Sequence, residues 1–288
     1  MTSEHTQLTS ASGYDIKRMI FSDPQAGSIP NSVPQINYKR IIIQTKNTDG
    51  TTGDLIISTS KLFSFGVSEN TNPETGKVNG YVLPICLWGK DGASKEEKDF
   101  TNTFDAIIER CKEHIVACRE DIEQYDLDMK ELKKFNPLYW KKDKGKVVEG
   151  TGPTLYAKLI VSKKHDKIVT MFYDSNGDTI DPTSLNGKYC HVNAAIKFES
   201  IFIGNKISMQ IKLYECEVKL AETGMKRLMK RPPSQSIVNV ASSSLPLNSP
   251  QDEIKDDDDD DAVQPPVKAV VKRKVKKVVR KGGGDDED

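Results

Sequence analysis

Apolar and polar residues alternate with a period of two along the second half of the chain. The alternation covers Thr154–Val161, Lys167–Tyr173, Lys188–Ile203 and Lys206–Lys219. Side chains of a strand point alternately to its two faces, so each segment predicts a strand with one buried face. Turn-forming residues lie at Asn176–Asp178 and at Gly204-Asn205. The last two segments therefore predict a tight hairpin.

The first half of the chain predicts three more strands and a long helix. The strands are expected at Tyr38–Thr45, Asp54–Thr59 and Tyr81–Trp88. The helix is expected from a stripe at helical spacing, formed by Phe100, Phe104, Ile107, Ile108, Cys111, Ile115 and Cys118. Ser94 and Glu97 have the spacing of a capping box at its start. Ile122–Phe135 predicts a second helix, which ends before Pro137.

About seven strands and a helical insert at about residues 95–135 define the expected fold. It is α+β, mainly antiparallel β, and an OB-type barrel is one such architecture. The domain would span residues 36–225. Residues 1–35 are rich in Ser, Thr, Gln and Pro and predict a flexible N-terminal arm. Residues 226–288 predict a disordered tail with acidic and basic blocks.

The polar faces of the later strands carry aromatic residues beside lysines. Bases stack on aromatic rings at roughly 1–3 kcal/mol each, while cations follow the phosphates, so this combination fits single-stranded nucleic acid. The candidate binding residues are Arg40, Tyr156, Lys158, Tyr189, His191, Lys197, Lys212 and Tyr214. Tyr139–Lys142 would lie at the edge of the same surface. A solvated or protein-packed face is the alternative explanation, because Tyr and Lys are common on solvated strand faces and Tyr is itself a good strand former.

Charge segregation changes what the composition implies. The 288 residues hold 42 Lys and Arg against 42 Asp and Glu, so the formal net charge is zero, which alone argues against a polyanionic partner. The zero is the sum of a net −4 in residues 94–135, +4 in 141–219, −3 in 251–288 and +3 in the remaining residues. Neutrality thus conceals a basic strand region and a mixed tail. Lys272–Lys277 is a nuclear import signal, an extra nucleic-acid contact or a solvated run.

The chain contains no recognisable catalytic motif. HExxH, Gly-x-Ser-x-Gly and Walker A patterns do not occur, so we expect a protein that is not an enzyme and has no cofactor and no metal. Cys111, His114 and Cys118 share one side of the helix and would need a fourth ligand to bind zinc. The alternative is that both cysteines belong to the buried stripe.

Targeting features favour a host cytoplasmic or nuclear protein that is not secreted. The longest apolar stretch is far shorter than the roughly 20 residues of a membrane span, and the first residues lack the pattern of a signal peptide. Five cysteines without CxxC pairs fit reduced thiols. We therefore expect no membrane association.

Several short motifs together resemble a known family. They are Gly152–Leu159, Gly187–Tyr189 and Phe202–Gln210, followed by an acidic C-terminus. Over roughly residues 36–220 the chain resembles the OB-fold single-stranded DNA-binding proteins of short-tailed phages and nucleocytoplasmic large DNA viruses. The resemblance implies coating of single strands, with an acidic tail that recruits the replication polymerase or helicase-primase and competes with DNA. The phage-type tail ends in an aromatic residue, whereas this chain ends at Asp288 and places Lys268–Lys281 between acidic blocks.

These observations give one leading hypothesis and two alternatives. The leading hypothesis is a single-stranded DNA-binding protein in viral DNA replication, recombination or repair, with homo-oligomerisation left open. One alternative is a virion-associated structural or interaction protein without nucleic-acid binding. The other is an RNA-binding accessory factor, which competition between oligo-U and oligo-dT would distinguish.

Overall fold

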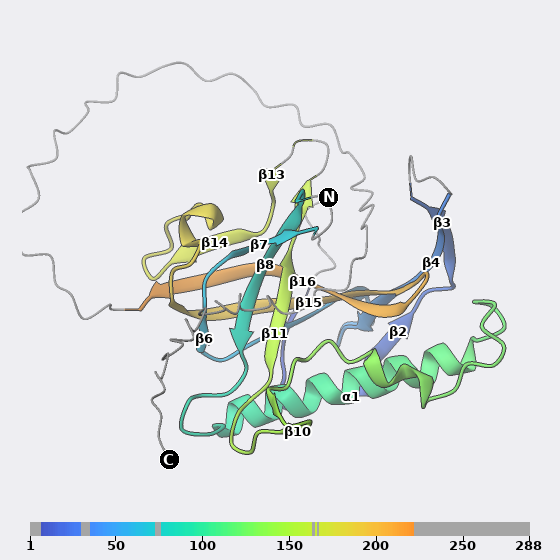
Figure 1. Cartoon of the computed structure of the whole chain (residues 1–288). Helices are drawn as coiled ribbons and strands as arrows, with labels where there is room; N and C mark the ends of the chain where they lie inside the picture. Colours follow the sequence, from blue (N-terminus) through green and yellow to red (C-terminus); the bar gives the residue numbers. More distant parts are fainter. Residues whose placement is uncertain (1–6, 30–34, 73–75, 163–164, 166, 222–288) are drawn as a thin grey trace, which may run out of the picture.

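The computed structural model describes residues 7–29, 35–72, 76–162, 165 and 167–221. Strands dominate this part of the chain, and one long helix, α1 (Lys95–Ala117), interrupts them (Figure 1). The strands before α1 are β1 (Gln7–Ser10), β2 (Met19–Phe21), β3 (Gln25–Ser28), β4 (Asn37–Lys46), β5 (Thr52–Ser58), β6 (Leu62–Ser64), β7 (Ser68–Thr71) and β8 (Val78–Cys86). The strands after it are β9 (Lys142–Asp143), β10 (Lys146–Val147), β11 (Thr154–Leu159), β12 (Val161–Ser162), β13 (Lys167–Ile168), β14 (Met171–Asp174), β15 (Cys190–Ile203) and β16 (Ile207–Leu220).

Five of these strands close into a barrel. Backbone pairing runs from β6 to β8, β11, β16 and β15, and then returns to β6. Only the β11–β16 pair among these five is parallel. A closed five-stranded barrel of this kind, with the α1 insert between β8 and β11, is an OB-type barrel. The expected fold class is therefore confirmed.

The β15–β16 hairpin joins the barrel to the remaining strands. Along one edge, β15 pairs with β16 from Cys190 to Ile203, as the sequence predicted. Its other edge pairs in turn with β6 at residues 190–192, β5 at 195–198 and β4 at 200–203. The long strand β15 therefore connects the barrel strands β6 and β16 to β4 and β5 of the N-terminal sheet.

The long helix agrees with its sequence signals. The side chain of Ser94 accepts a hydrogen bond from the Glu97 backbone, and the Glu97 carboxylate accepts one from the Ser94 backbone, which completes the expected capping box. The predicted apolar stripe is buried from Phe100 to Ile115. Among the described residues, no helix has both the length and the apolar character needed to cross a membrane.

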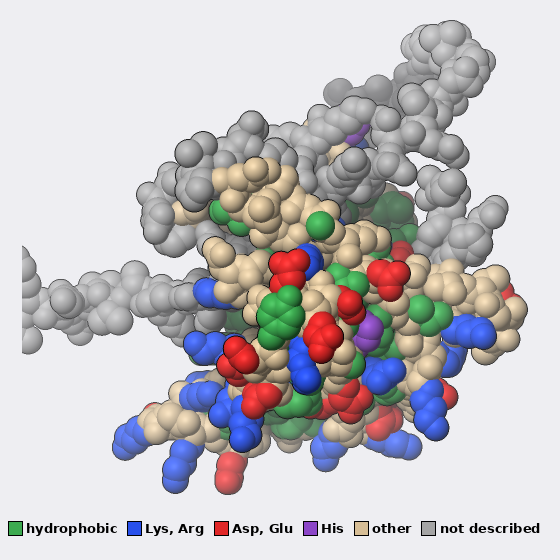
Figure 2. Space-filling model, turned by 90° about the vertical axis from the view of Figure 1, so that its right-hand side faces the viewer, with side chains coloured by type: hydrophobic (Ala, Val, Ile, Leu, Met, Phe, Trp, Pro, Cys, Tyr) green, Lys and Arg blue, Asp and Glu red, His purple; other side chains and the backbone are tan. Residues whose placement is uncertain are grey.

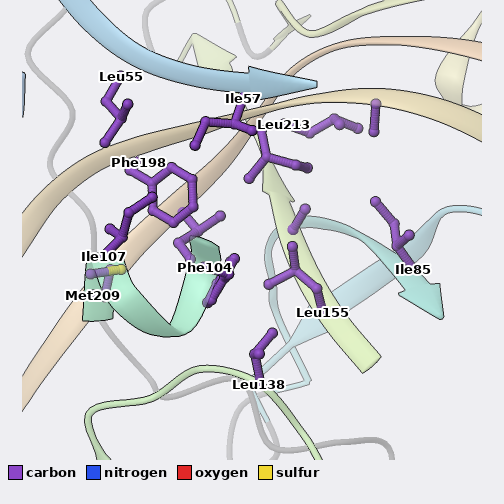
Figure 3. Close-up of a cluster of buried hydrophobic side chains, with 14 of the residues drawn as sticks. Leu55, Ile57, Ile85, Phe104, Ile107, Leu138, Leu155, Phe198, Met209 and Leu213 are labelled. Atoms are coloured by element: carbon purple, nitrogen blue, oxygen red, sulfur yellow. The ribbon is translucent and has the colours of Figure 1, made fainter. Parts of the chain in front are cut away.

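Aromatic packing inside the barrel fixes the helix to the strands. Phe104 of α1 meets Phe198 of β15 with ring centroids 5.0 Å apart. Figure 3 shows the two rings among aliphatic side chains from several strands, including Leu155 and Leu213. Leu155, Phe198 and Leu213 are all buried.

The predicted second helix does not form. Of the range 122–135, only the 3-10 turn η2 (Glu131–Lys134) is helical. Glu123 has φ +60°, a left-handed conformation that interrupts an α-helix. The apolar residues that gave the helical pattern are still buried: Ile122, Leu127, Leu132 and Phe135. Their spacing therefore reflects a loop packed onto the core.

The expected flexible arm is also corrected for residues 7–29. β1 runs parallel to β5, while β2 and β3 run antiparallel to β4. These short strands satisfy backbone groups along the edges of β4 and β5, a tertiary contact that composition does not report. Residues 1–6 and the predicted tail at 226–288, including Lys272–Lys277, lie outside the described residues.

We expect Phe104→Ala to lower the free energy of unfolding by about 3–5 kcal/mol, because it removes a buried ring and leaves a cavity between α1 and the barrel. Denaturant unfolding followed by circular dichroism measures this change. Asn102→Ala, at an exposed position of the same helix, is the control and should stay within about 0.5 kcal/mol of the unmodified protein. Equal stability of the two variants would contradict the central role of Phe104.

Candidate nucleic-acid interface

Three of the predicted lysines form a row on the outside of the barrel. Lys158 of β11 is in register with Lys212 of β16, which is in register with Lys197 of β15. Lys197 forms an ion pair with Asp54, with Nζ and Oδ2 2.9 Å apart. Lys158 donates a hydrogen bond of 3.1 Å to Gln210. We call Lys158, Lys197 and Lys212 the lysine row.

The middle of the lysine row is less accessible than expected. Lys212 is only 4% exposed, and Gln210, two residues earlier on β16, is buried as well. Adjacent strands lie about 4.8 Å apart, so the side chains of Lys158 and Lys197 flank Lys212 on both sides. Lys212 lies in register with Lys158 and Lys197 on the predicted polar face, but neighbouring side chains cover it.

Two further predicted residues, Tyr214 and Arg40, lie away from Tyr189 and His191 at the beginning of β15. Tyr214 follows the lysine row on β16 and is exposed. Arg40 of β4 is in register with Phe202, close to the end of β15. On the side of the molecule that carries β3 and β4, basic and acidic side chains are interspersed (Figure 2). Lys39 and Glu123 form an ion pair of 2.8 Å beside a cleft of about 600 Å³ at this end.

An exposed group of rings surrounds the beginning of β15. The phenyl ring of Phe63 lies 5.3 Å from Phe65, 5.7 Å from Tyr189 and 5.9 Å from His191, between ring centroids. Phe65 and Tyr189 are 44% and 60% exposed. Tyr189 and His191 were predicted from the sequence, whereas Phe63 and Phe65 were not. The four rings form one surface cluster from β6, the residue after it, and the start of β15.

A second pair of rings continues this surface across the barrel. Phe63 is in register with Cys86 of β8, and Cys86 is in register with Thr154 of β11. Tyr156, two residues after Thr154 and therefore on the same face, contacts Tyr139 at 6.4 Å between ring centroids. Burial raises the pKa of the Tyr156 hydroxyl, and Tyr139 adds to the effect. We call the whole set the aromatic face: Phe63, Phe65, Tyr139, Tyr156, Tyr189 and His191.

The aromatic face and the lysine row share β11 and β15, but only the aromatic face reaches β6 and only the lysine row includes Lys212 of β16. In the ring of five strands, β16 neighbours neither β6 nor β8. Lys212 and Tyr214 on β16 are therefore separated from Phe63 on β6 by β15 on one side and by β11 and β8 on the other. Tyr156 and Lys158 on β11 lie between the two regions. The surface inferred from strand alternation thus curves around the closed barrel instead of forming one flat face.

Other lysines surround the aromatic face. Lys61 precedes Phe63 by two residues, Lys188 precedes Tyr189, and Lys219 is in register with His191. All three are exposed. Cations beside exposed rings are the combination that single-stranded nucleic acid requires. The structure therefore supplies at the aromatic face the charges that the sequence analysis assigned to the lysine row.

Gly66 brings the two halves of the ring cluster together. Its φ is +85°, and a Cβ at this position would collide with the carbonyl oxygens of Leu185 and Lys188. Only glycine lets the backbone after Phe65 approach the backbone before Tyr189 this closely. Alternation in Leu62–Phe65 is the sequence signal that could have identified Phe63, but a strand of three residues is too short to stand out.

The residues considered for zinc binding have other surroundings. Cys111 is buried in the core, and burial raises the pKa of its thiol. The imidazole of His114 stacks on Phe21 with ring centroids 4.1 Å apart. The Cys118 thiol donates to the Ile115 carbonyl oxygen. Within the described ranges, no three His, Cys, Asp or Glu side chains are grouped to hold a metal ion.

Fold and surface together define an OB-type barrel protein with a helical insert and an aromatic outer face. The family described as "Protein of unknown function (DUF2738)" matches residues 12–260. The chain belongs to this family.

Viral proteins are among its relatives. Uncharacterized protein 007R of Invertebrate iridescent virus 3 is 29% identical over 211 residues, which cover 69% of this chain and 45% of the relative. The Early 31 kDa protein of Frog virus 3 (isolate Goorha) is 31% identical over 168 residues, which cover 56% of this chain and 62% of the relative. The chain thus spans about half of the length of these relatives.

A solved structure is also similar. It is the crystal structure of gp2.5, a single-stranded DNA-binding protein encoded by bacteriophage T7. The TM-score is 0.38 at 16% sequence identity, and the match covers 60% of this chain and 91% of that chain.

Gly66→Ala should destabilise the protein more than Gly50→Ala. Both glycines have φ near +86°, so both substitutions carry the left-handed strain of about 1–2 kcal/mol. A methyl group added at Gly50 would have no neighbouring atom within 4 Å, whereas one added at Gly66 meets two carbonyl groups, which costs about 1–3 kcal/mol more. Denaturant unfolding of the two variants measures the difference. Equal losses would show that close backbone approach at Gly66 is unimportant.

His114→Gln should reduce the pH dependence of stability. Burial, and secondarily the charge of Arg110, lower the pKa of His114 in the folded protein. Below the ordinary histidine pKa of about 6.5, the unfolded chain therefore binds the proton more readily than the folded one. Stability is lost as pH falls through this value toward the lowered pKa. Denaturant unfolding between about pH 7 and pH 5 should show a smaller loss in the variant, and an identical loss would contradict this origin.

Proposed function

We propose that this protein is a non-enzymatic single-stranded DNA-binding protein that coats exposed strands during viral DNA replication, recombination or repair. The observation that carries the proposal is the aromatic face, with exposed rings at Phe65, Tyr139 and Tyr189 and lysines around them. In chain order, β8 and β11 are the second and third of the five barrel strands. The outer surface of these two strands is where OB-type barrels bind oligonucleotides.

The rings match the energetics of sequence-tolerant binding. Every base has a flat π-face, so stacking on Phe65, Tyr189 or Tyr139 needs no particular base. The three rings are exposed, and their neighbours hold them in place. Rings that are already positioned lose less side-chain entropy when a strand binds, which favours affinity.

Charge supports the same surface. Lys61, Lys188 and Lys219 can neutralise phosphates next to the stacked bases, and Lys158 extends this charge along β11. Lys197, Lys212, Tyr214 and Arg40 would contact the strand only if it continues around the barrel toward β16. Among the residues inferred from sequence, the leading candidates for contact with DNA are therefore Tyr156, Lys158, Tyr189 and His191.

The wider biological role belongs to the proposal as well. The acidic tail would recruit the replication polymerase or helicase-primase and compete with DNA, and the protein would act in the host cytoplasm or nucleus. These parts rest on the family resemblance of residues 36–220. An exposed aromatic cluster also fits a protein interface, because Tyr and Phe are frequent in such contacts. Oligonucleotide binding decides between the two functions.

The double variant Phe65→Ala/Tyr189→Ala should bind oligo-dT much more weakly. Each lost stacking contact costs about 1–3 kcal/mol, or about 5- to 150-fold in Kd. Fluorescence anisotropy with a labelled oligonucleotide measures the affinity. Tyr125→Ala, which removes a 68% exposed ring from the loop after α1, is the matched control and should bind normally.

Three outcomes would refute the proposal in different ways. Absence of binding by the unmodified protein would favour a structural or interaction role. Equal binding to duplex and single strands would exclude a single-strand coating function. Tighter binding of oligo-U than oligo-dT would favour the RNA-binding alternative. Unmodified binding should also weaken steeply as salt rises.

A further inference from the structure

A small basic ribbon projects from the barrel beside the aromatic face. β9 and β10 pair only with each other within the described residues, with Lys142 opposite Val147 and Asp143 opposite Lys146. Lys144 and Gly145 both have positive φ at the turn, as a two-residue hairpin requires. We call residues 141–148 the basic ribbon. Figure 1 shows β10 near the beginning of α1 and the lower end of β11.

The two ends of the basic ribbon are joined at the aromatic face. Tyr139, two residues before the ribbon, exchanges two backbone hydrogen bonds of 2.9 and 2.8 Å with Thr154, six residues after it. The row of registered positions across the barrel therefore runs from Phe63 through Cys86 and Thr154 to Tyr139. The basic ribbon begins two residues beyond the last ring of that row.

Tryptophan packing anchors the base of the ribbon. Trp140 contacts Trp88 edge to face, with ring centroids 5.5 Å apart. Trp88 also donates a hydrogen bond of 2.9 Å to Thr101 of α1. Gly152 lies so close to Trp88 that a Cβ there would collide with the indole. The ribbon therefore extends from a base that is fixed to both β8 and α1.

The ribbon presents mainly charged side chains, beside one exposed apolar residue, Val147. Its four lysines, Lys141, Lys142, Lys144 and Lys146, are all exposed, and no ion pair among the described residues uses them. Two acidic residues, Asp143 and Glu149, lie in or next to it, so a net positive charge remains. Four exposed lysines on a short hairpin repel one another, and an approaching polyanion relieves that repulsion.

We propose that the basic ribbon binds the phosphodiester backbone of the same single strand whose bases stack on Tyr139 and Tyr156. The inference rests on the proposed function and assigns a second, purely electrostatic contact to it. A strand that crosses from the Phe63 cluster to Tyr156 reaches Tyr139 next, and its phosphates then meet the lysines of the ribbon. Stacking holds the bases, and the ribbon determines where the strand leaves the barrel.

The test compares two quadruple variants of the full chain. The ribbon variant carries Lys141→Ala, Lys142→Ala, Lys144→Ala and Lys146→Ala. The control carries Lys46→Ala, Lys130→Ala, Lys133→Ala and Lys134→Ala, which remove the same charge from exposed positions outside the ribbon. Binding of a long oligo-dT is measured over a series of salt concentrations, and denaturant unfolding checks that both variants fold.

The ribbon variant should lose about tenfold or more in affinity at low salt, and its slope of log affinity against log salt should fall by about 2–3, since each phosphate contact on a single strand contributes about 0.7. The control should keep nearly the full slope. Equal loss in both variants, or unchanged binding by the ribbon variant, would overturn the inference and leave the proposed function standing. Failure of the unmodified protein to bind would overturn both.

Fluorescence gives a second readout. Trp88 and Trp140 are the two tryptophans of the chain, and both lie at the base of the ribbon. Oligo-dT should change their emission in the unmodified protein and in the control. In a variant with the four ribbon lysines replaced by arginine, charge is retained, so affinity and the emission change should persist. Loss of both with arginine would contradict a purely electrostatic contact.

Discussion

The fold depends on one strand that is shared by two parts of the molecule. β15 is 14 residues long and gives one whole edge to β16, while its other edge serves β6, β5 and β4 in succession. The register of the β15–β16 pair shifts near Ala195 and Phe198, and such irregularities bend a strand. The bend lets the start of β15 complete the barrel while its end continues into the N-terminal sheet. The positions of Tyr189 at one end and Phe202 at the other follow directly.

This sharing also explains why the surface divides as it does. A strand in an open sheet shows its polar face to the same side as its neighbours, and alternation then describes one surface. In a closed barrel, the same alternation points outward in every direction. Lys212 and Tyr189 both lie on outward faces, as their sequence positions predicted, yet Lys212 belongs to β16 and Tyr189 directly precedes β15. The period of two distinguishes the inner face of a strand from its outer face. It does not tell where around the barrel an outer side chain lies.

Local signals were sufficient for the elements and for part of the site. The capping box at Ser94, the stripe around Phe104 and the final hairpin all have short-range causes, so the sequence predicted them correctly. The prediction of a helix at 122–135 was wrong because the apolar residues of a loop that packs onto the core are spaced like those of a helix. Phe63 and Phe65 were missed because their position depends on the contact of Gly66 with residues more than a hundred positions later. The roles of all these residues in binding stay predictions until oligonucleotides are tested.

The order of the strands has a consequence for synthesis on the ribosome. Domains fold from the N-terminus as they emerge, but β15 and β16 are the last strands of the described chain and supply partners to β4, β5, β6, β11 and β14. The backbone of Ala194 contacts Thr59 across 135 positions of sequence. The early strands therefore wait with unpaired edges until nearly the whole barrel has been translated. Such nascent chains are natural clients for chaperones, and a ribosome that stalls before residue 190 releases a product with open, aggregation-prone sheet edges.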